Sequence, residues 1–465
     1  MTSTVEELAL RCLLPGFVGT TAPDWVLRSA AEGLGGVVLY ARNVESREQL
    51  ADLNASLHAA RPGLLVAVDE EGGDVTRLEA KVGSSYPGNL ALGAADDLQL
   101  TADVAAAMGR DLAAVGIDLD LAPVADVNTN PDNPVIGVRS FGADPAAVAA
   151  QTAAWTRGLQ AAGVAACAKH FPGHGDTSLD SHLALPIVSE DPHMRALEPF
   201  RAAIAAGVKA IMSAHVVVEG IDEVPATISR AIMTGLLRDE LGFIGVAVTD
   251  GLEMRGLRDG RGVAEGAVLA LIAGCDALCV GGGLAGEETA EEIVRAIACA
   301  VKEGRLSEDR LVQAASRVDA LAGWRSRQKP VQQAEATDVG LVAARKALRY
   351  DGPVQVGDDV ALVQLASPRS IAAGEVPWGV AGELAARGAR MSPAGGSLVV
   401  VVRDLHRHPE HRQQVETLLA RRPDAVLVEM GVPQCRPQAA RAYIATYGSS
   451  RVCAIAAAEV MRPTA

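Results

Sequence analysis

The chain has 465 residues, which exceeds one ordinary domain, although an α/β barrel alone takes roughly 250 residues. Hydrophobic residues make up 49% and charged residues 21%, so a folded protein is expected and a disordered one is excluded. The 57 acidic residues outnumber the 42 basic ones and give a net charge of −15, which argues against nucleic acid as a partner. Aromatic residues are 3% of the chain, which favours a small polar pocket over broad stacking platforms.

The seven cysteines are an odd number, and most lie in apolar runs such as residues 163–171. This pattern predicts buried free thiols without disulfides. The opening segment MTSTVEELALRC carries acidic residues where a secretory leader needs basic ones, and no stretch reaches the length of a membrane span. We therefore expect a cytoplasmic protein with no membrane partner.

The first 325 residues alternate short apolar runs with alanine-rich amphipathic stretches, as at 145–163 and 262–274. This alternation is typical of βα units and a parallel sheet. Eight such units predict an α/β fold with a (β/α)8 TIM-type barrel, and a doubly wound sheet is the alternative. The expected strands are residues 12–18, 36–40, 64–69, 117–123, 163–171, 208–215, 245–250 and 276–282.

The composition changes after Trp324, where a polar, glutamine-rich segment begins. We predict a barrel over residues 1–325, a linker over 326–345 and a smaller C-terminal α/β sandwich domain over 346–465. Expected elements of this second region are strands at 360–366, 397–404, 425–431 and 452–459 and helices at 341–350 and 408–422.

Ionisable side chains close four of the eight predicted strands: Asp69 the third, Lys169 and His170 the fifth, His215 the sixth and Asp250 the seventh. The carboxyl ends of barrel strands form the face that carries catalytic groups. Because burying such groups without partners is unfavourable, they are expected to share a polar pocket.

The segment KHFPGHGDTSLDSHLALP, residues 169–186, has the densest chemistry, and its glycines and proline make it a loop. One interpretation is a pair in which Asp180 orients His182 for proton transfer. Another is a histidine-rich loop that only caps turns. A third is a metal site with ligands His170, His174, Asp176 and His182.

Asp250 is the best partner for such a pair, and its alternative role is to cap the following helix. In DEEGGDVTR, residues 69–77, two glycines permit a close backbone approach, and Arg77 is expected to turn back to the pocket; its alternative is a surface ion pair. The long loop 121–142 contains Arg139 as its sole cation and is expected to be functional. The cluster RDLHRHPEHR, residues 403–412, is interpreted as a solvated loop and helix start.

The strings DEEGGDVTR, VIGVRSFG, KHFPGHGDTSLDSHLALP and VTDGLEM, in this order, resemble glycoside hydrolase family 3. Within it they resemble the β-N-acetylglucosaminidase branch that acts on cell-wall fragments. The resemblance covers about residues 5–325, and the tail, with LVEMGVP and AYIATYGSSRV, resembles the shortened α/β sandwich domain of some members. The chain departs from the family's pattern at Asp74, where Arg is frequent, and at Gly251, where a larger or acidic residue is common.

The resemblance implies a retaining two-step displacement with Asp250 as nucleophile, His182 as general acid/base and Asp180 as its partner. A histidine suits this role because its ordinary pKa, near 6.5, lies close to neutral pH. The resemblance assigns Asp69, Arg77, Arg139, Lys169 and His170 to sugar binding, and we expect His215 to join them.

The predicted function is therefore an exo-acting retaining β-N-acetylglucosaminidase that cleaves terminal N-acetyl-β-D-glucosamine from muropeptide or chitin-derived oligosaccharides. The alternative is a β-N-acetylglucosaminide phosphorylase, with phosphate as acceptor, or another β-glycosidase of the family. The expected partner is a small amino-sugar glycoside, and no cofactor or metal is expected.

Overall fold

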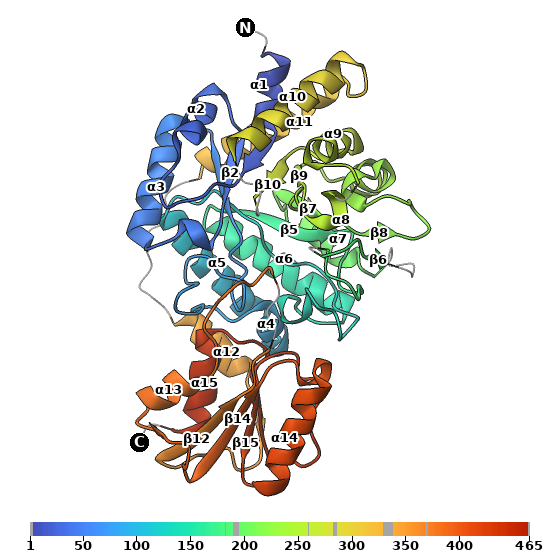
Figure 1. The fold of residues 1–465 in the computed structure, drawn as a ribbon. Helices are drawn as coiled ribbons and strands as arrows, with labels where there is room; N and C mark the ends of the chain where they lie inside the picture. The colour runs from blue at the N-terminus through green and yellow to red at the C-terminus, as the bar shows by residue number, and fades with distance from the viewer. Residues whose placement is uncertain are drawn as a thin grey trace.

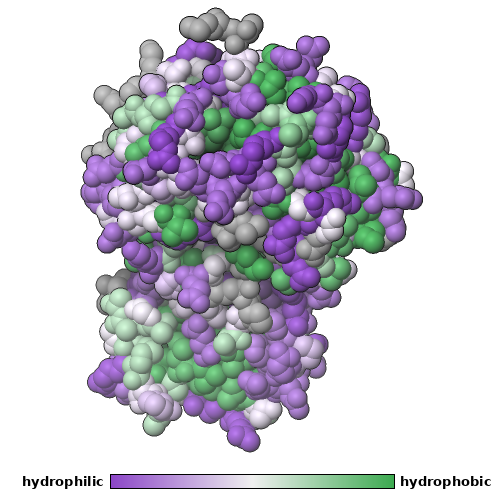
Figure 2. Space-filling model, turned by 45° about the horizontal axis from the view of Figure 1, so that its top comes forward, coloured by the Kyte–Doolittle hydropathy of each residue, from purple (hydrophilic) through white to green (hydrophobic). Residues whose placement is uncertain are grey.

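The computed structural model describes residues 3–181, 183–188, 195–258, 260–281, 286–328, 338–367 and 371–463. Figure 1 shows two α/β lobes, one built from the first part of the chain and one from the last. We call residues 3–328 the N-terminal unit and residues 338–463 the C-terminal unit. In Figure 2 the lobes meet at a narrower waist, and hydrophilic residues cover much of the visible surface of the N-terminal unit.

All eight strands expected in the N-terminal unit are present, each shorter than its predicted range. A parallel sheet runs in the order β2-β3-β4-β5-β7-β9, and β1 pairs in parallel with β10. A single parallel bridge, Val248–Ala277, joins the end of β9 to the residue before β10. The strands are β1 (Leu13–Pro15), β2 (Gly36–Leu39), β3 (Leu65–Val68), β4 (Leu119–Asp120), β5 (Ala165–Phe171), β7 (Ala210–Ser213), β9 (Val246–Val248) and β10 (Leu278–Val280).

The curled sheet has an outer and an inner set of side chains, because successive side chains of a strand point to opposite faces. Alternate residues such as Val37, Val66 and Ile211 pack outward against helices. The residues between them face inward, and strand by strand they form one buried apolar cluster that includes Leu14, Val38, Ala67, Leu119, Cys167, Met212, Val248 and Cys279. The N-terminal unit is thus an α/β fold with a curled parallel sheet.

Helices cover the outer face of this sheet (Figure 1). Their starts follow capping rules: Asp144 accepts a hydrogen bond from the Ala147 amide (2.8 Å) with Pro145 in the first turn of α6. The helices are α1 (Val5–Arg11), α2 (Asp24–Glu32), α3 (Arg47–Ala60), α4 (Asn89–Ala95), α5 (Leu98–Ala114), α6 (Pro145–Ala161), α7 (Glu198–Ala205), the π-helix η4 (Ala231–Glu240), α8 (Arg255–Arg258), α9 (Val263–Ala273), α10 (Glu287–Lys302) and α11 (Glu308–Ser326). Shorter elements are η1 (Ala41–Asn43), η2 (Gly137–Arg139), η3 (Ala226–Ile228) and the paired strands β6 (Ile187–Val188) and β8 (Val217–Val218).

The C-terminal unit has its own sheet, in the order β11-β16-β15-β14-β12-β13, in which β11 is antiparallel to β16 and the other pairs are parallel. One face packs on α13 and α15 and the other on α14, which makes an α/β sandwich. Its elements are α12 (Val339–Ala347), β11 (Arg349–Asp351), β12 (Asp359–Gln364), α13 (Ala381–Ala386), β13 (Arg390–Met391), β14 (Ser397–Val402), η5 (Leu405–Arg407), α14 (Pro409–Arg421), β15 (Val426–Glu429), β16 (Ala442–Ala445) and α15 (Arg451–Met461).

The strand expected at 452–459 was wrong, because this segment is α15. Ser450 caps the helix by accepting a hydrogen bond from the Cys453 amide (3.3 Å). A short apolar run does not distinguish a buried strand from a buried helix, and here the preceding cap residue and the alanines decide for the helix. The sheet instead contains β16, which begins ten residues earlier in the chain than the predicted strand.

The predicted division into domains stays a prediction, and residues 329–337 of the predicted linker lie outside the described residues. The prediction of free thiols is confirmed for all seven cysteines, of which five are buried. Within the described ranges, no helix combines the length and apolar character needed to cross a membrane.

The two units share a small apolar core at their junction. Alanines of α4 pack against α12 and α15 of the C-terminal unit, as Figure 1 indicates by the adjacent placement of α4 and α12. Polar contacts surround this core, including an ion pair between Lys346 and Asp97 (2.6 Å) and a hydrogen bond from Arg451 to Ser85 Oγ (2.6 Å).

Asp74, one of the two departures from the family pattern, has a structural explanation. Its buried carboxylate forms an ion pair with Arg403 and accepts hydrogen bonds from the hydroxyl (2.7 Å) and amide (3.2 Å) of Ser449. Both partners belong to the C-terminal unit. Asp74 therefore ties the loop after β3 to that unit.

Replacing Asp276 by Ala should lower the free energy of unfolding by about 3–5 kcal/mol, measured by urea denaturation. This fully buried carboxylate forms ion pairs with Arg238 (2.5 Å), Arg310 (2.9 Å) and Arg317 (3.0 Å), which would lose their partner. The matched control is Asp319→Ala, which removes a half-exposed carboxylate paired with Arg11 and costs at most about 1 kcal/mol. Equal losses in the two variants would contradict the assigned role of Asp276.

Candidate active site

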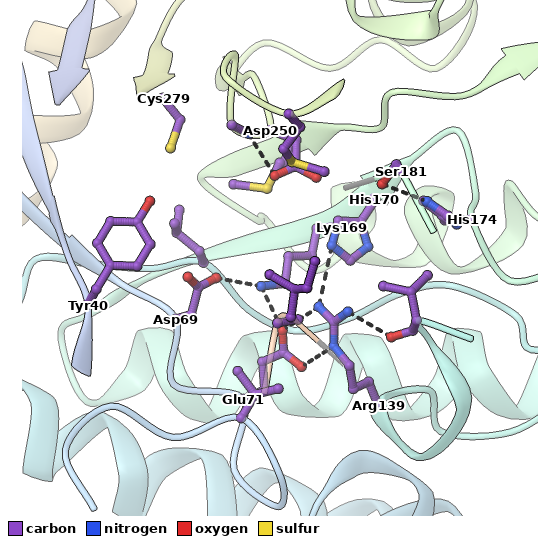
Figure 3. Close-up of a pocket in the computed structure, with 18 of the residues that line it drawn as sticks. Tyr40, Asp69, Glu71, Arg139, Lys169, His170, His174, Ser181, Asp250 and Cys279 are labelled. Atoms are coloured by element: carbon purple, nitrogen blue, oxygen red, sulfur yellow. Dashed lines mark hydrogen bonds and ion pairs between the residues drawn. The ribbon is translucent and has the colours of Figure 1, made fainter. Parts of the chain in front are cut away.

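A cavity of about 290 Å³ lies at the carboxyl ends of the strands of the N-terminal unit. Figure 3 shows side chains from several strand ends converging on it. Charged groups of both signs face each other across a small apolar floor. Its polar lining consists of Tyr40, Arg42, Asp69, Glu71, Arg77, Arg139, Lys169, His170, His174, Ser181, Asp250, Glu253 and Cys279.

Four charged residues at one wall form a continuous network, which we call the ion cluster: the buried Glu71, Arg139 and Lys169 and the partly exposed Asp69. The Lys169 ammonium lies 2.7 Å from a carboxylate oxygen of Asp69 and 2.7 Å from one of Glu71. Arg139 binds Glu71 through two parallel hydrogen bonds, from Nε (2.9 Å) and a terminal nitrogen (2.8 Å). Lys169 is 2% exposed and Glu71 3%, so these charges are stable there only as partners of each other.

The pKa values of the ion cluster shift in the direction that keeps every member charged. Burial alone would raise the pKa of Glu71, but Arg139 and Lys169 outweigh it and hold that pKa far below its usual range. Burial likewise opposes the charge of Lys169, yet Asp69 and Glu71 raise its pKa above the ordinary value. The pKa of Asp69 is lowered, since Lys169 and Arg77 outweigh its burial.

The loop after β3 explains why two acids of DEEGG reach the cavity. Asp69 and Glu71 point into it, whereas Glu70 points away and accepts hydrogen bonds from the amides of Arg77 (2.8 Å) and Leu78 (3.0 Å). Gly73 has a φ of +63°, and a Cβ there would lie 2.5 Å from the backbone of Gly88. The close backbone approach expected for this loop is therefore present.

Lys169 and His170 are consecutive residues of β5, yet both line the cavity. The pairing of β5 with β7 changes register between Ala168 and Phe171, which breaks the strict alternation of side chains at this strand end. His170 Nδ1 donates a hydrogen bond to Asp126 (2.7 Å), a fully buried carboxylate that also accepts from the His174 amide (2.7 Å).

His174 lies deeper and serves the loop structure. Burial lowers the pKa of His174 to about 4, so the ring is neutral at pH 7. The Thr177 hydroxyl donates to the His174 carbonyl (3.0 Å) and accepts from its Nδ1 (2.7 Å), while Nε2 lies 3.1 Å from Ser181 Oγ. Both ring nitrogens are thus engaged by neighbouring hydroxyls.

The described part of the chain does not gather the histidine-loop residues into a metal site. Asp176 accepts a hydrogen bond from Thr129 (2.9 Å), away from the His174 ring, and His182 lies outside the described residues. Among the described residues, three side chains bring potential metal-ligand atoms close together, and all three lie in the C-terminal unit: His408, Glu410 and His411.

Asp250 lies across the cavity from Glu71 and Arg139, with Lys169 between them in the view of Figure 3. It is partly accessible, and its carboxylate accepts a hydrogen bond from the Gly251 amide (2.8 Å). The next helix, α8, begins only at Arg255, so Asp250 is not in the position of its N-cap.

The other predicted site residues fall in three places. Arg77 lines the cavity, 3.6 Å from Asp69, so it is not a surface ion pair. His215 does not line it: this buried ring donates from Nε2 to the carbonyl of Gly251 (2.9 Å) and supports the loop that follows Asp250. Asp180 is buried and lines an adjoining groove, and its predicted partner His182 lies outside the described residues.

Sequence reasoning missed Glu71, Asp126, Tyr40 and two residues of the C-terminal unit. Glu71 could have been inferred, because it stands two residues after Asp69 and so shares its direction at a strand end. The backbone at Ile371 and Ala372 could not, since nothing in the sequence links it to residue 77. The Ala372 carbonyl accepts a hydrogen bond from Arg77 (2.9 Å), so the C-terminal unit forms part of the cavity wall.

Residues 22–321 match the family described as the glycosyl hydrolase family 3 N terminal domain. A beta-hexosaminidase of Stenotrophomonas maltophilia (strain R551-3) is 41% identical over 282 residues, 58% of this chain and 82% of the relative. Beta-hexosaminidase A of Pseudoalteromonas piscicida is 40% identical over 252 residues, 49% of this chain, and the chain spans only 42% of that protein. The solved structure of a family 3 beta-N-acetylglucosaminidase from Paenibacillus sp. str. FPU-7 is similar over 99% of this chain and 97% of its own, with a TM-score of 0.89 and 32% identity.

The substitution Glu71→Gln should lower the free energy of unfolding at pH 7. The difference from the wild type should become smaller as the pH falls. The lowered pKa of Glu71 gives the folded state an advantage that is fully present above the unfolded-state pKa, about 4.3, and disappears as the pH drops below it. Urea unfolding of both proteins at pH 7, 5, 4 and 3 measures this difference.

Glu416→Gln, on the exposed face of α14, is the control and should differ little from the wild type throughout. A difference between Glu71→Gln and the wild type that stays constant from pH 7 to pH 3 would show that Glu71 is not held ionised by its partners.

Proposed function

The chain belongs to glycoside hydrolase family 3, and from this premise we propose that it is an exo-acting, retaining β-N-acetylglucosaminidase. Its substrates would be oligosaccharides from cell walls (muropeptides) or chitin that end in N-acetyl-β-D-glucosamine. The observation that carries the proposal is the position of Asp250, which faces the ion cluster across a cavity of one-sugar size. Relatives named beta-hexosaminidase or beta-N-acetylglucosaminidase support the choice of sugar.

The proposal extends to the fold: the curled sheet would be a (β/α)8 barrel, and the C-terminal unit would be a separate domain. Support comes from the inward side chains of the eight strands, which form a single cluster. Catalytic groups at the carboxyl ends of the strands are the usual arrangement for such a barrel.

In the first step, a carboxylate oxygen of Asp250 attacks the anomeric carbon and the bond to the leaving-group oxygen breaks. His182, oriented by Asp180, donates a proton to that oxygen, so the leaving group departs as an alcohol. The products are a covalent glycosyl-Asp250 ester and an unprotonated imidazole. The cavity position of Asp250 supports its part, while the part of His182 comes from the family resemblance.

In the second step, His182 accepts a proton from water, and the resulting hydroxide oxygen attacks the anomeric carbon. The bond to Asp250 breaks, the carboxylate is restored, and the sugar leaves with its original configuration. Two inversions at one carbon give net retention.

The ion cluster would bind the sugar hydroxyls. Asp69 accepts hydrogen bonds, whereas Lys169 and Arg139 donate them, and their mutual contacts hold these groups in place before the sugar arrives. Because the protein sets the positions of donors and acceptors in advance, little binding free energy is lost in reorganising the site when the sugar binds. His170, fixed by Asp126, adds a further ring on this wall.

The first experiment compares hydrolysis of p-nitrophenyl N-acetyl-β-D-glucosaminide with that of the matching β-glucoside, with and without EDTA. We expect selective turnover of the N-acetyl substrate that is unaffected by EDTA. Turnover of the glucoside alone would overturn the choice of sugar, and EDTA-sensitive turnover would favour metal-dependent hydrolysis. Product analysis in phosphate and phosphate-free buffer identifies the acceptor: free N-acetylglucosamine supports hydrolysis, and its 1-phosphate supports the phosphorylase alternative.

Asp250→Ala should reduce kcat at least about 10³-fold while leaving the thermal unfolding temperature close to that of the wild type. Added azide should restore turnover, since this small anion fits where the carboxylate was, and the product should be the α-glycosyl azide. Asp176→Asn is the control, because Asp176 lies on the same histidine-rich loop but does not line the cavity. Wild-type rates in Asp250→Ala, or a β-configured azide product, would refute the nucleophile assignment.

A further inference from the structure

A groove of about 230 Å³ continues from the cavity into the space between the two units. Cavity and groove share four lining residues, Val135, Ile136, Arg139 and Ile371. Asp180 also lines the groove. If, as proposed above, the terminal sugar fills the cavity and Asp180 belongs to the acid/base pair, the groove lies on the side where the leaving group departs.

Most of the charges that line this groove are already neutralised. Arg139 is bound by Glu71, and Arg403 is bound by Asp74. Asp404 accepts a hydrogen bond from a backbone amide, that of Val432 (2.8 Å), and its other oxygen lies 3.9 Å from Arg403. These groups have partners within the protein and leave little net charge for a ligand.

Arg407 is different, because among the described residues it forms no ion pair, and it is only partly exposed. The ring of its neighbour His408 lies 3.2 Å from the Ser367 hydroxyl, so it is an oriented hydrogen-bonding group beside Arg407. Arg407 therefore supplies a cation on this wall that no carboxylate of the described residues neutralises.

The segment that carries Arg407 is held from both sides. The buried carboxylate of Glu429 accepts hydrogen bonds from the amides of Asp404 (2.8 Å) and Leu405 (3.0 Å). His406 donates to the carbonyl of Pro131 in the N-terminal unit (2.8 Å). These contacts fix the backbone of η5, so the guanidinium of Arg407 is attached to a rigid base rather than to a free loop.

Part of the groove lining is apolar and accessible. Leu183 and Ile371, each 57% exposed, line it together with the buried side chains of Val135 and Ile136. An exposed apolar pair beside a lone arginine suits a ligand with an apolar face and a single anionic group.

We propose that Arg407, with His408 beside it, binds a carboxylate on the leaving group and so gives the enzyme a preference for acidic over neutral leaving sugars. This inference rests on the proposed function and deepens it. The matched family region ends at residue 321, before the segment that carries Arg407, so this preference is assigned to the C-terminal unit of this chain. A guanidinium–carboxylate pair in a half-buried groove is expected to change kcat/KM by about tenfold.

The test uses two disaccharides that differ in one group: N,N′-diacetylchitobionate, whose former reducing end is a carboxylate, and N,N′-diacetylchitobiitol, where it is an alcohol. EDTA is present throughout, so that no metal binds at His408 and its neighbours. The wild type should show a ratio of kcat/KM, acidic over neutral, of about ten. In Arg407→Gln this ratio should fall to about one, and in Arg407→Lys it should lie between.

Arg421→Gln, an exposed arginine at the end of α14, is the matched control and should keep the wild-type ratio. A wild-type ratio near one, or a ratio that Arg407→Gln leaves unchanged, would overturn the inference and leave the proposed function standing. Absence of turnover on p-nitrophenyl N-acetyl-β-D-glucosaminide would overturn both. Circular dichroism and thermal unfolding of each variant separate a loss of preference from a loss of fold.

Discussion

The mutual neutralisation of Asp69, Glu71, Arg139 and Lys169 is the constraint on which the site depends. A buried charge without a partner is strongly destabilising, so the buried Glu71, Arg139 and Lys169 are stable here only as partners of each other and of Asp69. Together they connect the end of β3, the long loop after β4 and the end of β5. The same contacts that stabilise the fold at this point set the positions of hydrogen-bonding groups in the cavity. Stability and binding geometry therefore have one physical cause.

The sequence predicted much of this arrangement, because strand ends leave a clear pattern. Asp69, Lys169 and Asp250 each follow a short apolar run, and parallel strands bring their carboxyl ends to one face. The sequence was less informative about side chains whose place in the site depends on partners distant in the chain. Asp126 joins the site through His170, and Glu71 is paired with Arg139 across 68 positions of the chain; neither pairing is visible from local spacing. The roles of the predicted residues in catalysis and sugar binding stay predictions.

The C-terminal unit was the least predictable part. Its apolar runs are short, and residues 452–459 form a helix because the cap at Ser450 outweighs the appearance of a strand. Its relation to the active site depends on Asp74 and on the carbonyl of Ala372. The segment 403–412, interpreted as a solvated loop and helix start, does contain η5 and the start of α14, but its first residues line a groove beside the cavity.

The hydrogen bond from Arg77 to Ala372 is made with a backbone carbonyl, which every amino acid carries. This contact therefore does not depend on which side chain stands at position 372, provided that the path of the chain is kept. Loop length in this region, rather than residue identity, is the property that selection would be expected to preserve.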